Sequence, residues 1–301
     1  MAGPKLRAFR ERVLLRALRA VSFVGRRIPL RMGQKLGRSI GSLAWVVARR
    51  DRRKAMENMA VAFPKWTATE RRRVARAMFR HLGAALFEIV WLPNLTAQDP
   101  NTAFEGLDRV LDLIRSGRAV VAFTGHCGNW EWLAYAVGKL APVTVLQRER
   151  SEAGLNQFIT NIRTNAGIHT IDRGSTAAGR ELIRAMRKPG FVAFLIDQSI
   201  RAESAKVPFF GQPALTPIGP ATLAIRTGAV AVAAFIERRD DGTHLIRFQE
   251  PIETHRGDDP IALTERITRA IEEQIRRVPE QWVWMHDRWR DRPKWDVRST
   301  Q

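Results

Sequence analysis

Apolar and polar positions follow two different periods along this chain, and the period changes near residue 105. Before that point, residues 69–90 are predicted to form one helix, because apolar residues recur there at the spacing of a single helix face. The residues on that face are Val74, Met78, Leu82, Leu86 and Ile89. Pro93, Asn94 and the pair Asp99-Pro100 then mark a boundary, since such residues favour turns.

After residue 105, short apolar runs alternate with segments of helical period. The predicted strands are 119–124, 143–146, 168–171, 191–196, 229–236 and 244–249. One helix is predicted to begin near residue 130, and further helices are predicted over 152–165, 176–187, 219–227 and 260–278. A loop rich in Pro and Gly covers 199–219. This alternation predicts an α/β fold with a mostly parallel central sheet flanked by helices on both faces.

The N-terminal segment alternates basic and apolar clusters. Apolar residues recur at helical spacing among arginines over residues 14–24, and Ile40–Ala48 forms a second apolar stretch. Basic amphipathic helices of this kind suit the surface of a bilayer. A helical subdomain packed on the main body, with solvated arginines, is the alternative. We therefore divide the chain into a basic, helical membrane-associating segment (1–65) and an α/β domain (66–301).

Charge sharpens this division. Residues 1–65 hold 17 Lys and Arg against 3 Asp and Glu, so they carry +14 of the net charge of +20. A charge of that sign attracts polyanions, and anionic lipid is favoured over nucleic acid because no recognition motif for nucleic acid is present. Arg16, Arg19, Arg26 and Arg27 interrupt what would be the apolar region of a secretory signal, and no transmembrane helix is predicted. The single cysteine, Cys127, excludes an intramolecular disulfide.

Polar residues follow four successive predicted strands. They are His126, Arg148, the pair Asp172-Arg173 and the pair Asp197-Gln198. Because ligands of open parallel sheets bind beyond the carboxyl ends of the strands, we expect a site at this edge.

The first strand end carries the most specific chemistry, in Thr124-Gly-His-Cys-Gly-Asn-Trp-Glu131. Asn129 suits the N-cap of the following helix, and Glu131 then lies in its first turn. We expect Glu131 to orient the imidazole of His126, which removes a proton from an attacking hydroxyl. A helix start that is merely well capped, with His126 filling a turn, is the structural alternative.

This segment resembles a known family. The His-x4-Glu element is similar to the His-x4-Asp/Glu motif of glycerolipid acyltransferases, and its setting resembles the lipid A late acyltransferases (lauroyl/myristoyl type) and the phosphatidylinositol mannoside acyltransferases. The resemblance covers most of the chain. Further matching stretches are Arg53-x4-Asn58-Met59-x3-Phe63-Pro64, Arg163, Asp172-Arg173, Asp197-Gln198 and Val207-Pro-Phe-Phe-Gly211.

The resemblance implies an O-acyltransferase that moves a fatty acyl chain from a thioester to a hydroxyl of a membrane glycolipid. The favoured acceptor is a lipid A precursor. It implies His126 as general base and Glu131 as its partner. Asn129, Arg148, Arg163, Arg173, Asp197 and Gln198 are the expected substrate-binding residues. No cofactor or metal is implied. The donor is acyl carrier protein, an acidic partner that a basic surface attracts, or acyl-CoA. The expected location is the cytoplasmic face of the bacterial inner membrane, peripheral or monotopic.

Other interpretations remain. A lysophospholipid or phosphatidylinositol mannoside could be the acceptor, and a non-enzymatic lipid-binding protein would also keep the basic N-terminus. The sequence Gly37-Arg-Ser39-Ile-Gly41 matches the Gly-x-Ser-x-Gly motif of serine hydrolases, but no strand is predicted before it. A metal site of His126, Cys127 and Glu131 lacks a second ligand pair. The tryptophans at 282, 284, 289 and 295 suit an interfacial belt, a channel wall or a segment packed on the core.

Overall fold

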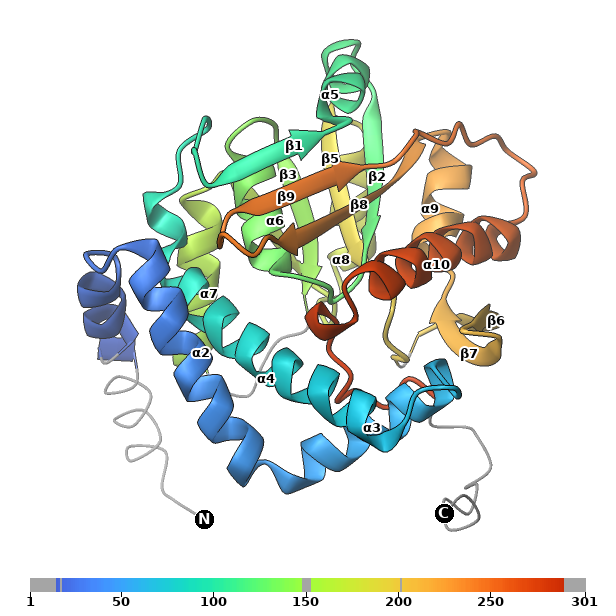
Figure 1. Cartoon of the computed structure of the whole chain (residues 1–301). Coiled ribbons are helices and arrows are strands. Elements are labelled where there is room, and N and C mark those ends of the chain that lie inside the picture. The colour runs from blue at the N-terminus through green and yellow to red at the C-terminus, as the bar shows by residue number, and fades with distance from the viewer. Residues whose placement is uncertain (1–14, 17, 148–152, 201, 290–301) are drawn as a thin grey trace, which may run out of the picture.

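The computed structural model describes residues 15–16, 18–147, 153–200 and 202–289. At its centre lies a seven-stranded sheet with the order β1-β9-β8-β2-β5-β3-β4 (Figure 1). Its strands are β1 (Thr102–Glu105), β2 (Ala119–Thr124), β3 (Val143–Gln147), β4 (Ile168–Asp172), β5 (Gly190–Leu195), β8 (Val230–Arg238) and β9 (His244–Phe248). Every neighbouring pair is parallel except β8 and β9. The predicted α/β fold with a mostly parallel central sheet is confirmed.

Helices cover both faces of this sheet. They are α2 (Leu30–Val47), α3 (Arg49–Ala62), α4 (Ala68–Trp91), α5 (Leu107–Arg115), α6 (Trp130–Gly138), α7 (Ala153–Thr164), α8 (Ala178–Met186), α9 (Gly219–Thr227) and α10 (Pro260–Arg277), with the 3-10 turns η1 (Leu92–Asn94) and η2 (Pro279–Gln281). Side chains alternate between two cores, as the period of a strand requires. Val121 and Phe123 of β2 belong to the core with α3, α4, α9 and α10, whereas Val120 and Ala122 belong to the core with α5, α6 and α7.

Two helices of the N-terminal half, α2 and α4, pack closely along one another (Figure 1). Helix α4 begins at a capping box, in which Thr67 and Glu70 satisfy each other's backbone N–H groups. Helix α3 contributes Ala55, Met59 and Ala62 to the core that it shares with α4, α9 and α10. Of the helices in the described part of the chain, none has both the length and the apolar character that a membrane span needs.

The segment 199–219 corrects one prediction. It contains a two-stranded antiparallel hairpin, β6 (Ser204–Phe209) and β7 (Gln212–Pro217), rather than only a loop. Prolines 208, 213 and 217 hide the strand signal because proline is depleted in sheets; here it is tolerated because the hairpin is isolated from the large sheet. Strand β1 and helix α5 were also not predicted.

Candidate active site

The strand order brings two predicted site residues together. His126 follows β2 and Asp197 follows β5, and these strands are neighbours in the sheet. Thr124 of β2 lies opposite Leu195 of β5 in the parallel register, so the two strands end at the same level of the sheet. The chain visits β3 and β4 before it returns to β5 beside β2, and such a reversal of strand order opens a crevice at the carboxyl edge.

His126 and Asp197 are joined by two hydrogen bonds. The imidazole Nδ1 lies 2.8 Å from Asp197 Oδ1, and the backbone N–H of His126 donates to Oδ2 over 2.7 Å. The imidazole side chain keeps 22% of its surface exposed, whereas that of Asp197 is fully buried. Trp130 lies edge-on to the imidazole, with ring centroids 4.9 Å apart. One ring edge of His126 is therefore fixed by the protein, and the side chain still reaches solvent.

The Asp197 carboxylate is buried but remains ionised. Burial raises its pKa, but the positive charge of His126 and the hydrogen bonds from His126 and Trp282 outweigh that effect and lower the pKa to about 2. The Trp282 indole N–H donates to Asp197 Oδ2 over 2.7 Å. Since an ionised carboxylate only accepts hydrogen bonds, Nδ1 of His126 carries a proton. In the neutral imidazole, Nε2 is then the nitrogen with a free lone pair.

Glu131 has a different partner from the predicted one. Its carboxylate accepts two hydrogen bonds from Arg163, from Nη2 over 2.6 Å and from Nε over 3.0 Å. Arg163 also donates from Nη1 to Gln147 Oε1 over 2.7 Å. Both members of this pair are largely buried. The structure thus joins Glu131 to Arg163 of α7 and joins the imidazole to Asp197.

Asn129 supports the site but is occupied by protein contacts. Its side-chain oxygen accepts the backbone N–H of Trp132 over 3.1 Å, as expected for an N-cap, and its amide donates to Glu88 over 2.9 Å. Arg173 and Gln198 are half-buried. Arg148 lies outside the described residues.

The turn that carries His126 is braced by the segment around Trp282, for which the sequence left several roles open. The segment 281–283 runs alongside it: Gly128 N–H donates to Gln281 O over 2.8 Å, and Val283 N–H donates to His126 O over 3.2 Å. Gly128 has φ 67°, and a Cβ there would lie 2.2 Å from Ile236 O, so only glycine fits. Trp282, Trp284 and Trp289 are buried in the core, which confirms packing for these three; Trp295 lies outside the described residues.

Beneath the turn lies a buried ionic cluster. Arg238 donates from Nε and Nη2 to the two oxygens of Glu88, each over 2.6 Å, and Gln34 donates to Glu88 over 2.7 Å. Arg238 also exchanges two backbone hydrogen bonds with the Gln281 amide. Glu88 therefore links α2, α4 and β8 to Asn129 at the start of α6. A lone Glu inside a helix gives no sign of this in a sequence.

Two alternative chemistries lose their basis. Ser39 lies inside α2, where its hydroxyl donates to Lys35 O, and not at the sharp strand-to-helix turn of a serine hydrolase. Cys127 is buried, and burial together with nearby carboxylates, Asp197 foremost, raises the pKa of its thiol. A neutral thiol is neither a nucleophile nor a metal ligand.

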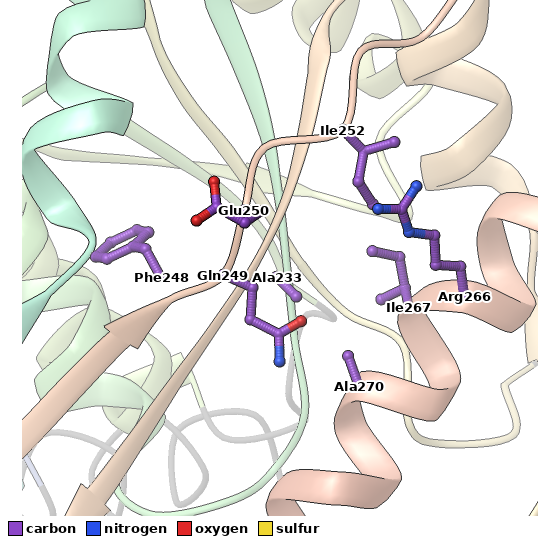
Figure 2. A pocket seen from close by; sticks show the side chains of 8 residues that line it. All are labelled: Ala233, Phe248, Gln249, Glu250, Ile252, Arg266, Ile267 and Ala270. Atoms are coloured by element: carbon purple, nitrogen blue, oxygen red, sulfur yellow. The ribbon is translucent and has the colours of Figure 1, made fainter.

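Two cavities lie near the sheet. The larger, about 350 Å³, lies between the end of β9 and helix α10, with Gln249, Glu250 and Arg266 at its polar rim (Figure 2). The smaller, about 70 Å³, reaches from Trp130, Glu131 and Arg163 along the apolar side of the sheet under α6. The smaller cavity is the one that adjoins the site, because Trp130 contacts both it and His126.

The fold and this edge of the sheet define an α/β enzyme with a carboxylate-held histidine, and sequence comparison identifies its class. The sequence model of bacterial lipid A biosynthesis acyltransferases matches residues 5–291. The chain is 27% identical over 262 residues to the lipid A biosynthesis palmitoleoyltransferase of Escherichia coli (strain K12), covering 86% of this chain and 85% of that one.

Two further relatives match less closely. The chain is 24% identical to the lipid A biosynthesis lauroyltransferase of the same strain over 89% of this chain and 88% of that one. It is 25% identical to a phosphatidylinositol mannoside acyltransferase of Mycobacterium tuberculosis (strain CDC 1551 / Oshkosh), over 67% and 66%. The chain belongs to the bacterial lipid A biosynthesis acyltransferase family, and it is an O-acyltransferase.

Proposed function

We propose that this chain transfers a fatty acyl group from an acyl thioester to a hydroxyl of a membrane glycolipid, namely a lipid A precursor, at the cytoplasmic face of the inner membrane. The observation that carries the proposal is the geometry of His126. Its Nδ1 is held by a buried, ionised Asp197, its side chain reaches solvent, and it lies at the carboxyl edge of the sheet.

The reaction follows from that geometry. Nε2 of His126 removes the proton from the acceptor hydroxyl as its oxygen attacks the thioester carbonyl. The tetrahedral intermediate collapses, the C–S bond breaks, and the leaving thiolate takes the proton back from the imidazolium. Asp197 stabilises the imidazolium between these two steps, as the carboxylate does in a Ser-His-Asp triad, but here the substrate supplies the nucleophile. No covalent enzyme intermediate is required.

Glu131 then has a positioning role in this proposal. It fixes Arg163 through a bidentate pair, and Arg163 uses three of its five N–H donors on Glu131 and Gln147. The two remaining donors suit a phosphate oxygen of the donor or of the acceptor. Arg173, which follows β4, and Gln198, which follows Asp197, are further substrate-binding residues in this proposal. Arg148 is included among them from the sequence alone.

The apolar cavity beside Glu131 and Arg163 supports the assignment of the acyl group. It is walled by aliphatic and aromatic side chains, among them Leu133, Val145 and Phe191. An acyl chain whose carbonyl lies at His126 can place its first methylenes there. For the donor, the net charge of +20 favours acyl carrier protein, because an acidic protein is attracted to a basic one; acyl-CoA is the alternative.

The acceptor is tested by a comparison of three lipids. Purified protein is incubated with an acylated carrier protein and, separately, a lipid A precursor, a phosphatidylinositol mannoside and a lysophospholipid, and products are measured by mass spectrometry. We expect one added acyl chain on the lipid A precursor. Acylation of either other lipid with an unchanged lipid A precursor would contradict the acceptor assignment. The mannoside is included because one relative bears that activity in its name.

A further inference from the structure

Large apolar side chains are exposed along one side of helix α2. Nine of the twelve large hydrophobic residues with high exposure among the described residues lie between positions 21 and 47. Six of them are on α2: Met32, Leu36, Ile40, Leu43, Val46 and Val47, each 53–69% exposed. We call these six residues the outward α2 face. Five of them recur every three or four positions, so they form one stripe along the helix.

Three of the five buried residues of α2, on its opposite side, are glycines. Gly33, Gly37 and Gly41 are buried against α4. A Cβ at Gly37 would lie 2.4 Å from Gly83 O, and one at Gly41 would lie 2.1 Å from Phe79 O, so the two backbones are in close approach. Small residues at every fourth position allow this packing in membrane helices as well. Helix α2 therefore packs its glycines against the protein and leaves six large aliphatic residues exposed, although Leu30 and Trp45 at its two ends pack inward.

The charge around this stripe selects its occupant. From Arg12 to Arg50 the sequence contains no Asp or Glu. The exposed cations next to the outward α2 face are Arg31, Lys35, Arg49, Arg50 and Arg53. A second copy of this chain would bring the same positive charges against these, which disfavours association of two α2 faces. An anionic bilayer surface satisfies both features, since its acyl region accepts the aliphatic side chains and its headgroups attract the cations.

We propose that the outward α2 face inserts into the interfacial layer of an anionic membrane, with α2 lying in the plane of that layer. This inference rests on the proposed function, in which the acceptor is a membrane lipid. Helix α2 packs on α4, and Ala85 O and Glu88 of α4 both accept from Asn129 in the catalytic turn. Helix α4 therefore lies between α2 and the turn that carries His126.

A variant of the whole protein tests the surface. In Leu36→Gln/Ile40→Gln/Leu43→Gln, three members of the stripe become polar with little change of volume. The matched control is Ile183→Gln/Ile261→Gln, which changes two exposed isoleucines on α8 and α10. Binding is measured by co-sedimentation with vesicles of phosphatidylethanolamine and phosphatidylglycerol. We expect the α2 variant to bind at least about tenfold more weakly and the control to bind as wild type. Equal binding by all three proteins would overturn the proposal.

A second measurement reports insertion directly and does not depend on the folding of the triple variant. Cys127 is buried, so a single added cysteine can be labelled selectively with an environment-sensitive fluorophore. We expect the emission of labelled Ile40→Cys to shift to the blue when the vesicles are added, and that of labelled Ile261→Cys to stay unchanged. Blue-shifted emission from Ile40→Cys before vesicles are added would mean that protein covers the face, in a dimer or within the chain, and would overturn the proposal.

These readouts are independent of acyl transfer. The variant His126→Ala should bind vesicles as wild type does while losing activity, so failure of the proposed chemistry leaves the membrane test intact. Conversely, loss of vesicle binding in the α2 variant with normal transfer to a detergent-solubilised acceptor supports both proposals. Neutral phosphatidylcholine vesicles should bind the wild type more weakly than anionic ones, and equal binding to the two would contradict the role of the cations.

Discussion

At the scale of single residues, the site depends on which group holds His126. The buried Asp197 carboxylate accepts from the imidazole Nδ1, from the His126 backbone and from the Trp282 indole. These donors keep Asp197 ionised despite burial, and they fix the tautomer that leaves Nε2 able to accept a proton. Replacing Asp197 by Asn would remove this charge with little change in the shape of the side chain.

The variant Asp197→Asn tests this arrangement. The amide keeps the volume but can donate to Nδ1, which favours the wrong tautomer, and it cannot stabilise an imidazolium. We expect kcat to fall by about 10²–10⁴, while KM for the acceptor changes little. Steady-state kinetics of acyl transfer measures both values. A rise in KM with normal kcat would instead indicate that Asp197 binds substrate.

Arg163 can be tested against its partner. In Arg163→Lys the positive charge stays, but the bidentate geometry toward Glu131 is lost. We expect a loss of about 1–3 kcal/mol in transition-state stabilisation, measured from kcat/KM. The variant Glu131→Gln should cause a similar loss, and the double variant should lose less than the two single losses added together, because the residues act as a pair. Additive losses would contradict that coupling.

The sequence predicts part of this site and not the rest, for a physical reason. The glycine-flanked His126 before an N-cap, and the polar residues after four apolar runs, are local signals. The pairing of His126 with Asp197 depends on β5 lying beside β2, and strand order is a property of the packed sheet. Glu131 is near His126 in sequence but is carried along α6 to Arg163. The predicted roles of these residues stay predictions until the variants are assayed.

At the scale of elements, α2 and α4 pack with their backbones in close approach. Gly37 and Gly41 meet Gly83 and the backbone around Phe79, with no room for a side chain, and Gly33 meets the ring of Phe87. A sequence can suggest this spacing but not the partner helix. The hairpin β6–β7 illustrates the same limit, because its prolines suppress the strand pattern although residues 207 and 209 are buried.

Substituting a methyl group at this crossing should loosen it. For Gly37→Ala, the added carbon meets Gly83 O and backbone atoms of Ala84 that cannot move aside, so we expect a loss of about 1–3 kcal/mol in the free energy of unfolding. The matched control is Gly179→Ala in α8, where a Cβ meets nothing within 4 Å and helix propensity favours Ala by about 1 kcal/mol. Chemical denaturation measures both. Equal stability of the two variants would contradict the close crossing.

At the scale of the whole molecule, the cluster around Glu88 connects both cores to the catalytic turn. Burial raises the Glu88 pKa, but the positive charges of His244 and Arg238 and the hydrogen bonds from Arg238 hold it well below its usual range. In the same cluster, burial and the charge of Arg238 hold the pKa of His81 well below its usual range. The folded protein therefore keeps Glu88 charged and His81 neutral.

The low pKa of His81 in the folded protein predicts that the free energy of unfolding decreases in acid. A histidine with a depressed folded pKa is protonated more readily when unfolded, so its contribution is complete above about pH 6.5 and diminishes as the pH falls below that value. We expect the free energy of unfolding to fall by at most about 1.4 kcal/mol per pH unit from His81. A second fall should follow below about pH 4, where Asp197 and Glu88 are protonated in the unfolded chain.

The measurement is denaturant unfolding, between pH 7.5 and 5 for the contribution of His81 and below about pH 4 for that of Asp197 and Glu88. His81→Gln should show a flatter dependence than wild type, and His255→Gln, at an exposed position, should keep the wild-type slope. Identical slopes for all three proteins would show that the buried cluster does not couple to pH.

The central claim is that His126, held by Asp197, removes the proton from the acceptor hydroxyl. Its most direct test is the rate of acyl transfer to the lipid A precursor by wild type and by His126→Gln, with folding and vesicle binding verified as unchanged. We expect kcat to fall by about 10²–10⁴, because the general base is lost while substrate binding remains. Acyl transfer by His126→Gln at a rate near that of wild type would contradict it.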